Sequence, residues 1–88
     1  MATAPNSAPR LTLLVRAYCH LCDEMRAALL PLLDGSDVVV DEFDVDADPA
    51  LEKAWGDQVP ALLAGTRELC HYHLDRNAVL AYLAQTSS

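Results

Sequence analysis

Two cysteines separated by two residues, Cys19 and Cys22, constrain this chain of 88 residues more than any other feature. They follow an apolar run, residues 11–17, that is typical of a buried strand, and they precede a segment whose apolar residues recur at helical spacing. A helix N-terminus offers unpaired N–H groups and a partial positive charge, and both favour a thiolate over a thiol. We therefore expect Cys19 at the cap, partly exposed, and Cys22 one turn inside and more protected.

Three kinds of site are compatible with this spacing: a redox-active dithiol, half of a zinc site, and an inert structural disulfide. The chain has no basic start followed by an apolar signal segment, and no apolar run is long enough to span a bilayer. We therefore expect a cytoplasmic protein, in which thiols are kept reduced. That environment weighs against a structural disulfide and leaves the dithiol and the zinc site open.

The formal net charge of −7 argues against partners that carry phosphate, namely nucleic acids and anionic membrane surfaces. We interpret the acidity as a contribution to solubility. The length allows one domain with one modest core, and we expect a monomer. Residues 1–10, which are rich in alanine, proline and polar residues, are expected to form a flexible N-terminal tail, and residues 11–85 a single domain.

The hydrophobic pattern predicts the element order β-α-β-α-β-β-α. The strands are expected at residues 11–15, 38–43, 59–63 and 67–70, and the helices at residues 19–33, 49–55 and 76–84. Pro31 should kink or end the first helix, and Asp48 and Asp75 should cap the other two. The first two strands should be parallel, and the last two should form a hairpin at Gly65-Thr66. A small mixed sheet with helices on both faces, an α/β fold, accounts for the apolar runs.

In this order of elements the chain resembles the small glutaredoxin-like proteins of bacteria, which belong to the thioredoxin superfamily. The resemblance extends from residue 11 to about residue 83 and depends on Cys19-His20-Leu21-Cys22, Val59-Pro60, Gly65 and the acidic stretch of residues 44–49. It implies a thioredoxin-like fold, with a four-stranded mixed sheet flanked by helices, and an activity in thiol–disulfide exchange.

By position, the resemblance makes Cys19 the catalytic nucleophile and Cys22 the resolving thiol. His20 could favour the thiolate when it is protonated, or it could be a solvated loop residue. Asp23 and Glu24 should oppose the thiolate slightly.

The resemblance also implies a substrate-binding surface, to which we assign Arg16, Tyr18, Val59 and Pro60. Pro60 would be a cis-proline beside the dithiol, and the backbone of Val59 would pair with an incoming peptide or glutathione. A cation at Arg16 could stabilise the thiolate and attract a carboxylate.

The expected partner is a protein with a disulfide, or a glutathione mixed disulfide; no bound cofactor is expected, and glutathione is a candidate co-substrate. Cys70-His71 lies near the place where typical glutaredoxins carry Gly-Gly. We expect Cys70 to be a packing residue; a third, accessory thiol is the alternative. His71 and His73 alternate on or just after a strand and should share a face, and with the two cysteines they could form a zinc site. The alternatives to an exchange enzyme are therefore a redox-inert adapter with a thioredoxin fold and a zinc-binding module.

Overall fold

The computed structural model describes residues 9–86, so residues 1–8 of the expected tail lie outside the described residues. The elements are β1 (Arg10–Val15), α1 (His20–Leu33), β2 (Val39–Asp44), η1 (Val45–Ala47), α2 (Pro49–Trp55), η2 (Gly56–Gln58), β3 (Ala61–Ala64), β4 (Arg67–His71) and α3 (Arg76–Thr86). The predicted order of helices and strands is confirmed. Two short 3₁₀ turns, η1 and η2, were not predicted.

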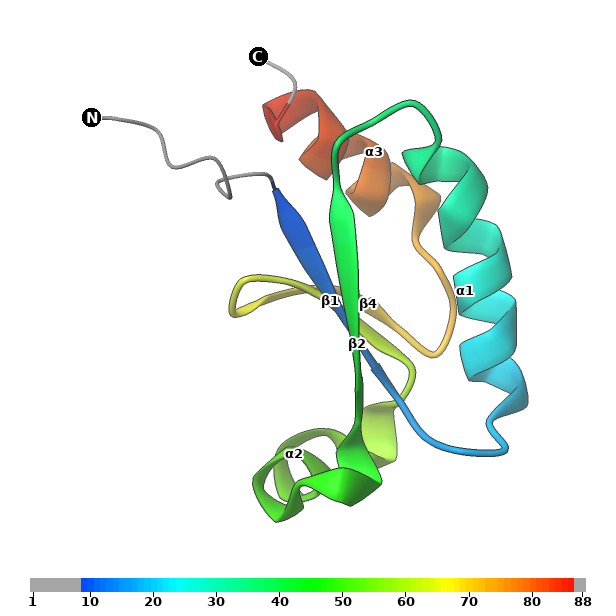
Figure 1. Cartoon of the computed structure of the whole chain (residues 1–88), viewed down its shortest axis with the longest axis vertical. Helices are drawn as coiled ribbons and strands as arrows, with labels where there is room; N and C mark the ends of the chain where they lie inside the picture. Colours follow the sequence, from blue (N-terminus) through cyan, green and yellow to red (C-terminus); the bar gives the residue numbers. More distant parts are fainter. Residues whose placement is uncertain (1–8, 87–88) are drawn as a thin grey trace.

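The four strands form one mixed sheet in the order β2-β1-β3-β4 (Figure 1). β1 is parallel to β2 and antiparallel to β3, and β3 and β4 form the expected hairpin. Gly65 has a φ of 64° in the hairpin turn, a conformation that glycine adopts without steric cost. In the part of the chain from residue 9 to residue 86, no helix is long and apolar enough to cross a membrane.

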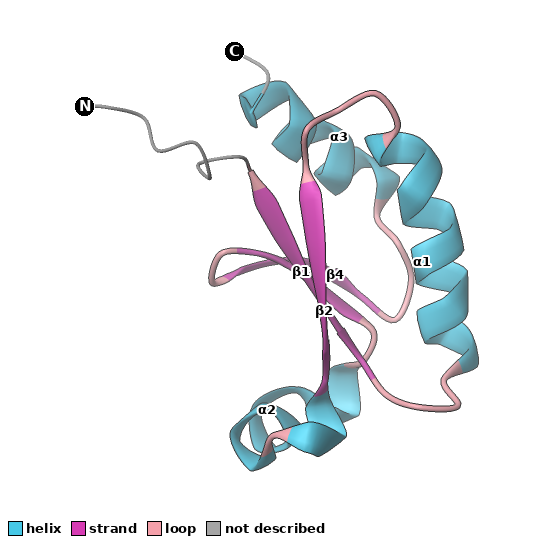
Figure 2. Ribbon diagram, viewed as in Figure 1, coloured by secondary structure: helices cyan, strands magenta, loops and turns pink. Residues whose placement is uncertain are grey.

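The core is divided between the two faces of the sheet, because neighbouring side chains of a strand point to opposite sides. Leu11 and Leu13 of β1 face the larger cluster, which includes Met25 and Leu29 of α1 and Val79 of α3. On the other face, Leu14, Val45, Ala61 and Leu63 pack with Leu51 and Trp55 of α2. Helices α1 and α3 therefore cover one face, and the short α2 lies on the other (Figure 2).

Several element boundaries differ from the predicted ones. Arg10, which was expected to lie in the tail, begins β1 and pairs with Val39. Helix α1 ends at Leu33, as predicted, with Pro31 inside its last turn. Helix α3 continues to Thr86, whose hydroxyl donates a hydrogen bond to the carbonyl of Leu83 at 3.1 Å. This bond satisfies one of the carbonyls that a helix end leaves open.

Arg26 ties α1 to the edge strand β2. Its Nε and one terminal nitrogen donate to the two carboxylate oxygens of Glu42 at 2.8 and 2.9 Å, and the other terminal nitrogen donates to Asp23 at 2.9 Å. The hydrogen bonds from Arg26 lower the pKa of Glu42, although burial acts in the opposite direction. This two-point pair holds the first turns of α1 against the sheet.

We expect Glu42→Gln to lower the free energy of unfolding by about 0.5 kcal/mol at pH 7, because the pair is partly exposed and screened by solvent. The pKa of Glu42 is lower in the folded than in the unfolded state. The carboxylate therefore stabilises the fold above its unfolded pKa of about 4.3, and this contribution is lost as the pH falls through the folded pKa. Urea unfolding of both proteins between pH 7 and 3 should show that the difference in the free energy of unfolding shrinks as the pH falls. The control Asp37→Asn, in the exposed loop between α1 and β2, should change that free energy little at any pH. A difference that grows toward pH 3 would contradict this account.

Candidate active site

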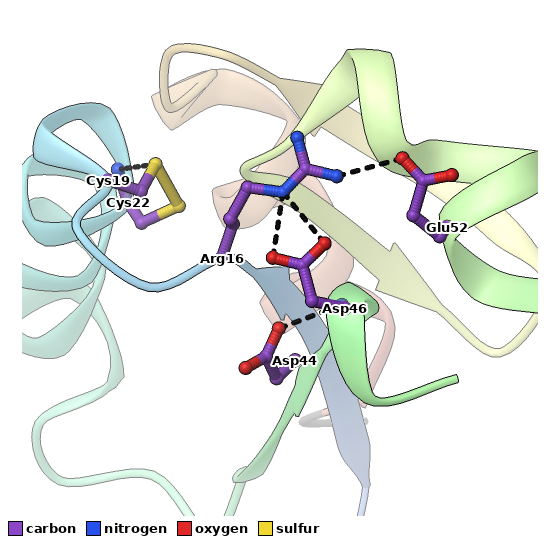
Figure 3. Close-up of polar contacts among 6 residues, drawn as sticks. All are labelled: Arg16, Cys19, Cys22, Asp44, Asp46 and Glu52. Atoms are coloured by element: carbon purple, nitrogen blue, oxygen red, sulfur yellow. Dashed lines mark hydrogen bonds and ion pairs between the residues drawn. A yellow bond between two sulfur atoms is a disulfide. The ribbon is translucent and has the colours of Figure 1, made fainter. Parts of the chain in front are cut away.

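Cys19 and Cys22 lie at the start of α1 and are joined by a disulfide (Figure 3). Cys19 is the N-cap residue, with an extended backbone, and its Sγ accepts a hydrogen bond from the N–H of Cys22 at 3.0 Å. The side chain of Cys19 is partly exposed, whereas only 1% of Cys22 is exposed. Both positions are as the sequence predicted.

This arrangement makes the two sulfur atoms chemically unequal. When the disulfide is reduced, the sulfur of Cys19 would still lie at a helix N-terminus, next to a backbone N–H donor. Both features favour its thiolate form. The sulfur of Cys22 lies one turn inside, away from solvent. The geometry is therefore suited to attack through Cys19, followed by resolution through Cys22.

Arg16 lies between the dithiol and an acidic surface, but its guanidinium points toward the acids (Figure 3). Its Nε contacts both carboxylate oxygens of Asp46, at 3.1 and 3.2 Å, and one terminal nitrogen contacts Glu52 at 3.0 Å. Desolvation acts to lower the pKa of Arg16, but the charge of Asp46 and the hydrogen bonds to both acids outweigh it and raise that pKa. The positive charge that we expected to act on the thiolate is thus directed to two carboxylates.

Gly56 allows Glu52 to reach Arg16. A Cβ atom at position 56 would collide with the carboxylate of Glu52 and would lie 3.2 Å from a terminal nitrogen of Arg16. The buried glycine therefore leaves room for this ion pair beside the turn that leads to Val59.

The segment Val59-Pro60 precedes β3, which begins at Ala61 and not at Val59 as predicted. The peptide bond between Val59 and Pro60 is cis. Leu14 pairs with Ala61, so the antiparallel register carries this segment toward the loop between β1 and α1 that holds the dithiol. Tyr72 holds this part of the chain through two hydrogen bonds. The backbone N–H of Tyr72 donates to the carbonyl of Pro60 at 2.8 Å, and the hydroxyl of Tyr72 donates to the carbonyl of Asp57, just before the segment.

Tyr18, the residue before Cys19, is fully exposed and has a φ of 58°. This left-handed conformation is uncommon outside glycine and turns the ring into solvent at the edge of the dithiol. The Nε2 atom of His20 lies 2.8 Å from a carboxylate oxygen of Glu24 on the exposed side of α1. An aromatic ring and an imidazole therefore border the partly exposed Cys19.

The expectation that His71 and His73 share a strand face was wrong. Strand β4 ends at His71, and Tyr72 turns the chain with a φ of 65°. His71 contacts Glu68 at 2.6 Å instead. Among residues 9–86, no three histidine, cysteine or acidic side chains lie close enough together to hold a metal ion.

Cys70 of β4 is a buried member of the larger core cluster. It pairs with Leu62 in the sheet. Burial raises the pKa of its thiol, although a hydrogen bond from the backbone of Asp75 acts in the opposite direction. This environment disfavours a thiolate and suits a small packing residue.

Three residues that shape the site were not predicted from the sequence: Asp46, Glu52 and Tyr72. The contact between Asp46 and Arg16 could have been predicted from the sequence. Arg16 follows β1 and Asp46 follows β2, and the carboxyl ends of parallel strands meet at one edge of a sheet. No local pattern connects Glu52 or Tyr72 with the dithiol.

Comparisons with known proteins give consistent matches. The sequence model of the family described as Glutaredoxin-like domain (DUF836) matches residues 10–84. The chain is 30% identical over 86 residues to a Mycobacterium tuberculosis protein named Uncharacterized protein Rv0508, covering 92% of this chain and 89% of the relative.

Solved structures are similar as well. The solution NMR structure of protein Ne2328 from Nitrosomonas europaea matches with a TM-score of 0.76 and 34% identity, over 92% of this chain and 98% of that one. The X-ray structure of protein XcR50 from X. campestris matches with a TM-score of 0.62 and 34% identity, over 85% of this chain and 96% of that one. A mutant thioredoxin from Halobacterium salinarum matches with a TM-score of 0.60, over 90% of this chain and 74% of that one. Its sequence is only 23% identical, so this similarity concerns the fold alone.

Proposed function

The chain belongs to the glutaredoxin-like domain family, and on that premise we propose that it is a thiol–disulfide oxidoreductase working through Cys19 and Cys22. One observation carries the proposal: a partly exposed cysteine caps a helix, accepts a hydrogen bond from the N–H of its partner, and is joined to that partner by a disulfide. The same geometry is what thiolate chemistry requires.

The reaction has two steps. The thiolate of Cys19 attacks one sulfur of a substrate disulfide, that S–S bond breaks, and the departing thiolate takes a proton from solvent. The thiolate of Cys22 then attacks the sulfur of Cys19 in the mixed disulfide and releases the second substrate thiol. The substrate gains two electrons and two protons, and the protein is left with the Cys19–Cys22 disulfide.

The substrate surface is proposed to include Tyr18 and the backbone of Val59, next to Pro60. The segment Val59-Pro60 lies just before β3, and the backbone of Val59 is the proposed pairing partner of an extended peptide. Tyr72 would act as a positioning residue for this segment through its two hydrogen bonds. We further propose that the protein works in the cytoplasm, where reducing systems can regenerate the dithiol.

The reduction potential of the dithiol tests the proposal. The protein is equilibrated with dithiothreitol or glutathione buffers of known potential, and the free thiols are alkylated and counted by mass spectrometry. Known exchange catalysts lie between about −270 and −120 mV, and we expect a value in that range. Reduction of a protein disulfide and of a glutathione mixed disulfide is assayed side by side. A potential below about −300 mV, with neither substrate reduced, would instead identify a redox-inert adapter.

A further inference from the structure

Exposed carboxylates lie in the first turns of α1, next to the dithiol in sequence, and at the neighbouring edge of the sheet. Asp23 and Glu24 lie in the first turns of α1, directly after Cys22. Asp44 is the last residue of β2, where it pairs with Val15 at the end of β1, and Asp46 follows it in η1. Glu52 extends from α2 toward the same edge of the sheet (Figure 3). The dithiol is the reactive centre, and these acids set the charge that an incoming disulfide meets.

The arginines nearest the dithiol do not offset this charge. Arg16 is held between Asp46 and Glu52. Arg26 is held between Asp23 and Glu42. Each cation thus has two carboxylate partners, so each group of three carries a net negative charge.

We propose that the Cys19–Cys22 dithiol selects disulfides that carry positive charge, such as a protein segment with lysine or arginine beside its cysteine, over anionic disulfides such as oxidised glutathione. The inference rests on the proposed exchange function and specifies its substrate class. The chemistry is the two-step exchange already described, with the substrate disulfide as the oxidant of the dithiol. Exposed ion pairs change an equilibrium or a rate by about 1.5- to 5-fold each, so several neighbouring carboxylates together give about tenfold selection.

Small disulfides of similar length and different charge test this selection. Fully reduced protein is mixed with cystamine, a dication, with 2-hydroxyethyl disulfide, which is neutral, or with dithiodipropionate, a dianion. Loss of free thiols is followed by alkylation and mass spectrometry in a single turnover. Each rate is divided by the rate of 2-mercaptoethanol with the same disulfide, because the leaving thiols differ in pKa.

We expect the normalised rate with cystamine to exceed that with dithiodipropionate by about tenfold at low salt. The ratio should fall toward one in 1 M salt, where the screening length is about 3 Å. Oxidised glutathione should behave like the dianion.

Paired variants separate the local acids from the net charge of the protein. Asp46→Asn with Glu52→Gln releases Arg16 and removes two negative charges beside the dithiol. The control pair, Asp34→Asn with Asp37→Asn, also removes two negative charges, but after the C-terminal end of α1, away from the dithiol. The first pair should lower the cystamine-to-dithiodipropionate ratio by at least about fivefold, and the second by less than about twofold. Because both rates depend equally on the thiolate fraction of Cys19, the ratio does not respond to a change in its pKa.

The outcomes are distinct. Equal normalised rates for all three disulfides in the unmodified protein, or equal effects of the two variant pairs, would overturn the charge selection and leave the exchange function intact. Failure of every disulfide to oxidise the dithiol would overturn the proposed function itself. The salt dependence of the unmodified protein gives an answer even where a variant fails to fold.

Discussion

Replacing Cys19 with serine is expected to lower the rate of disulfide exchange by about a thousandfold or more, to the background of the uncatalysed reaction, because it removes the attacking sulfur. Cys22→Ser should behave differently. It keeps the helix-cap thiol and loses only the second step, so a mixed disulfide between Cys19 and the substrate should accumulate. The reason for this asymmetry is the exposure of the two cysteines: Cys19 is partly exposed, whereas Cys22, in the first turn of α1, is buried.

Intact-mass spectrometry of each variant, incubated with an oxidised substrate, measures both effects. Cys70→Ala is the matched control, because it also removes one thiol from the chain, but from the buried core between the sheet and helices α1 and α3. Burial raises the pKa of Cys70, so its loss should change the exchange rate less than about twofold. Trapping through Cys22 in the Cys19 variant, at a yield equal to that of Cys19, would refute the assignment of roles. A large loss of exchange in Cys70→Ala, with the Cys19–Cys22 disulfide intact, would show instead that a third thiol takes part.

The position of the dithiol could be predicted because it depends on local sequence. An apolar run followed by apolar residues at helical spacing places Cys19 at the start of a helix, and this prediction needs no information about distant parts of the chain. The same applies to Asp48, whose side chain caps α2 by accepting from the N–H of Ala50 at 2.9 Å. The parallel pairing of β1 with β2 followed from the helix that connects them, and the β3–β4 hairpin followed from the short turn between them.

The environment of the dithiol could not be predicted to the same degree, because it depends on contacts between residues far apart in the sequence. Arg16 could be assigned a role beside Cys19, but its partners come from η1 and α2, 30 and 36 residues later. The hydrogen bonds of Tyr72 depend on a left-handed backbone conformation at that residue. Glycine and asparagine are the residues that usually indicate this conformation in a sequence, and position 72 is a tyrosine. The same turn separates His71 from His73 and removes the shared face on which a zinc site depended.

Replacing Leu29 with alanine is expected to lower the free energy of unfolding by about 3 kcal/mol. Leu29 lies in α1, is only 1% exposed, and packs in the larger core cluster between α1, α3 and the sheet. Truncation removes buried methyl groups and leaves a cavity that the surrounding side chains fill only in part. The total stability of a domain is about 5–15 kcal/mol, so the loss is a large share of it.

Leu30→Ala is the matched control, since it makes the same change at the next residue of the same helix, where the side chain is 59% exposed. We expect a change within about 0.5 kcal/mol, because little apolar surface is lost and alanine favours the helix. Urea unfolding of the oxidised proteins gives both free energies. Similar slopes of the free energy of unfolding against urea concentration would show that the variants expose the same amount of surface when they unfold. Equal losses for the two variants would contradict the assignment of the buried face. That face also includes Cys22 and Met25, so the packing measured at Leu29 is the packing that holds the dithiol end of α1 against the sheet.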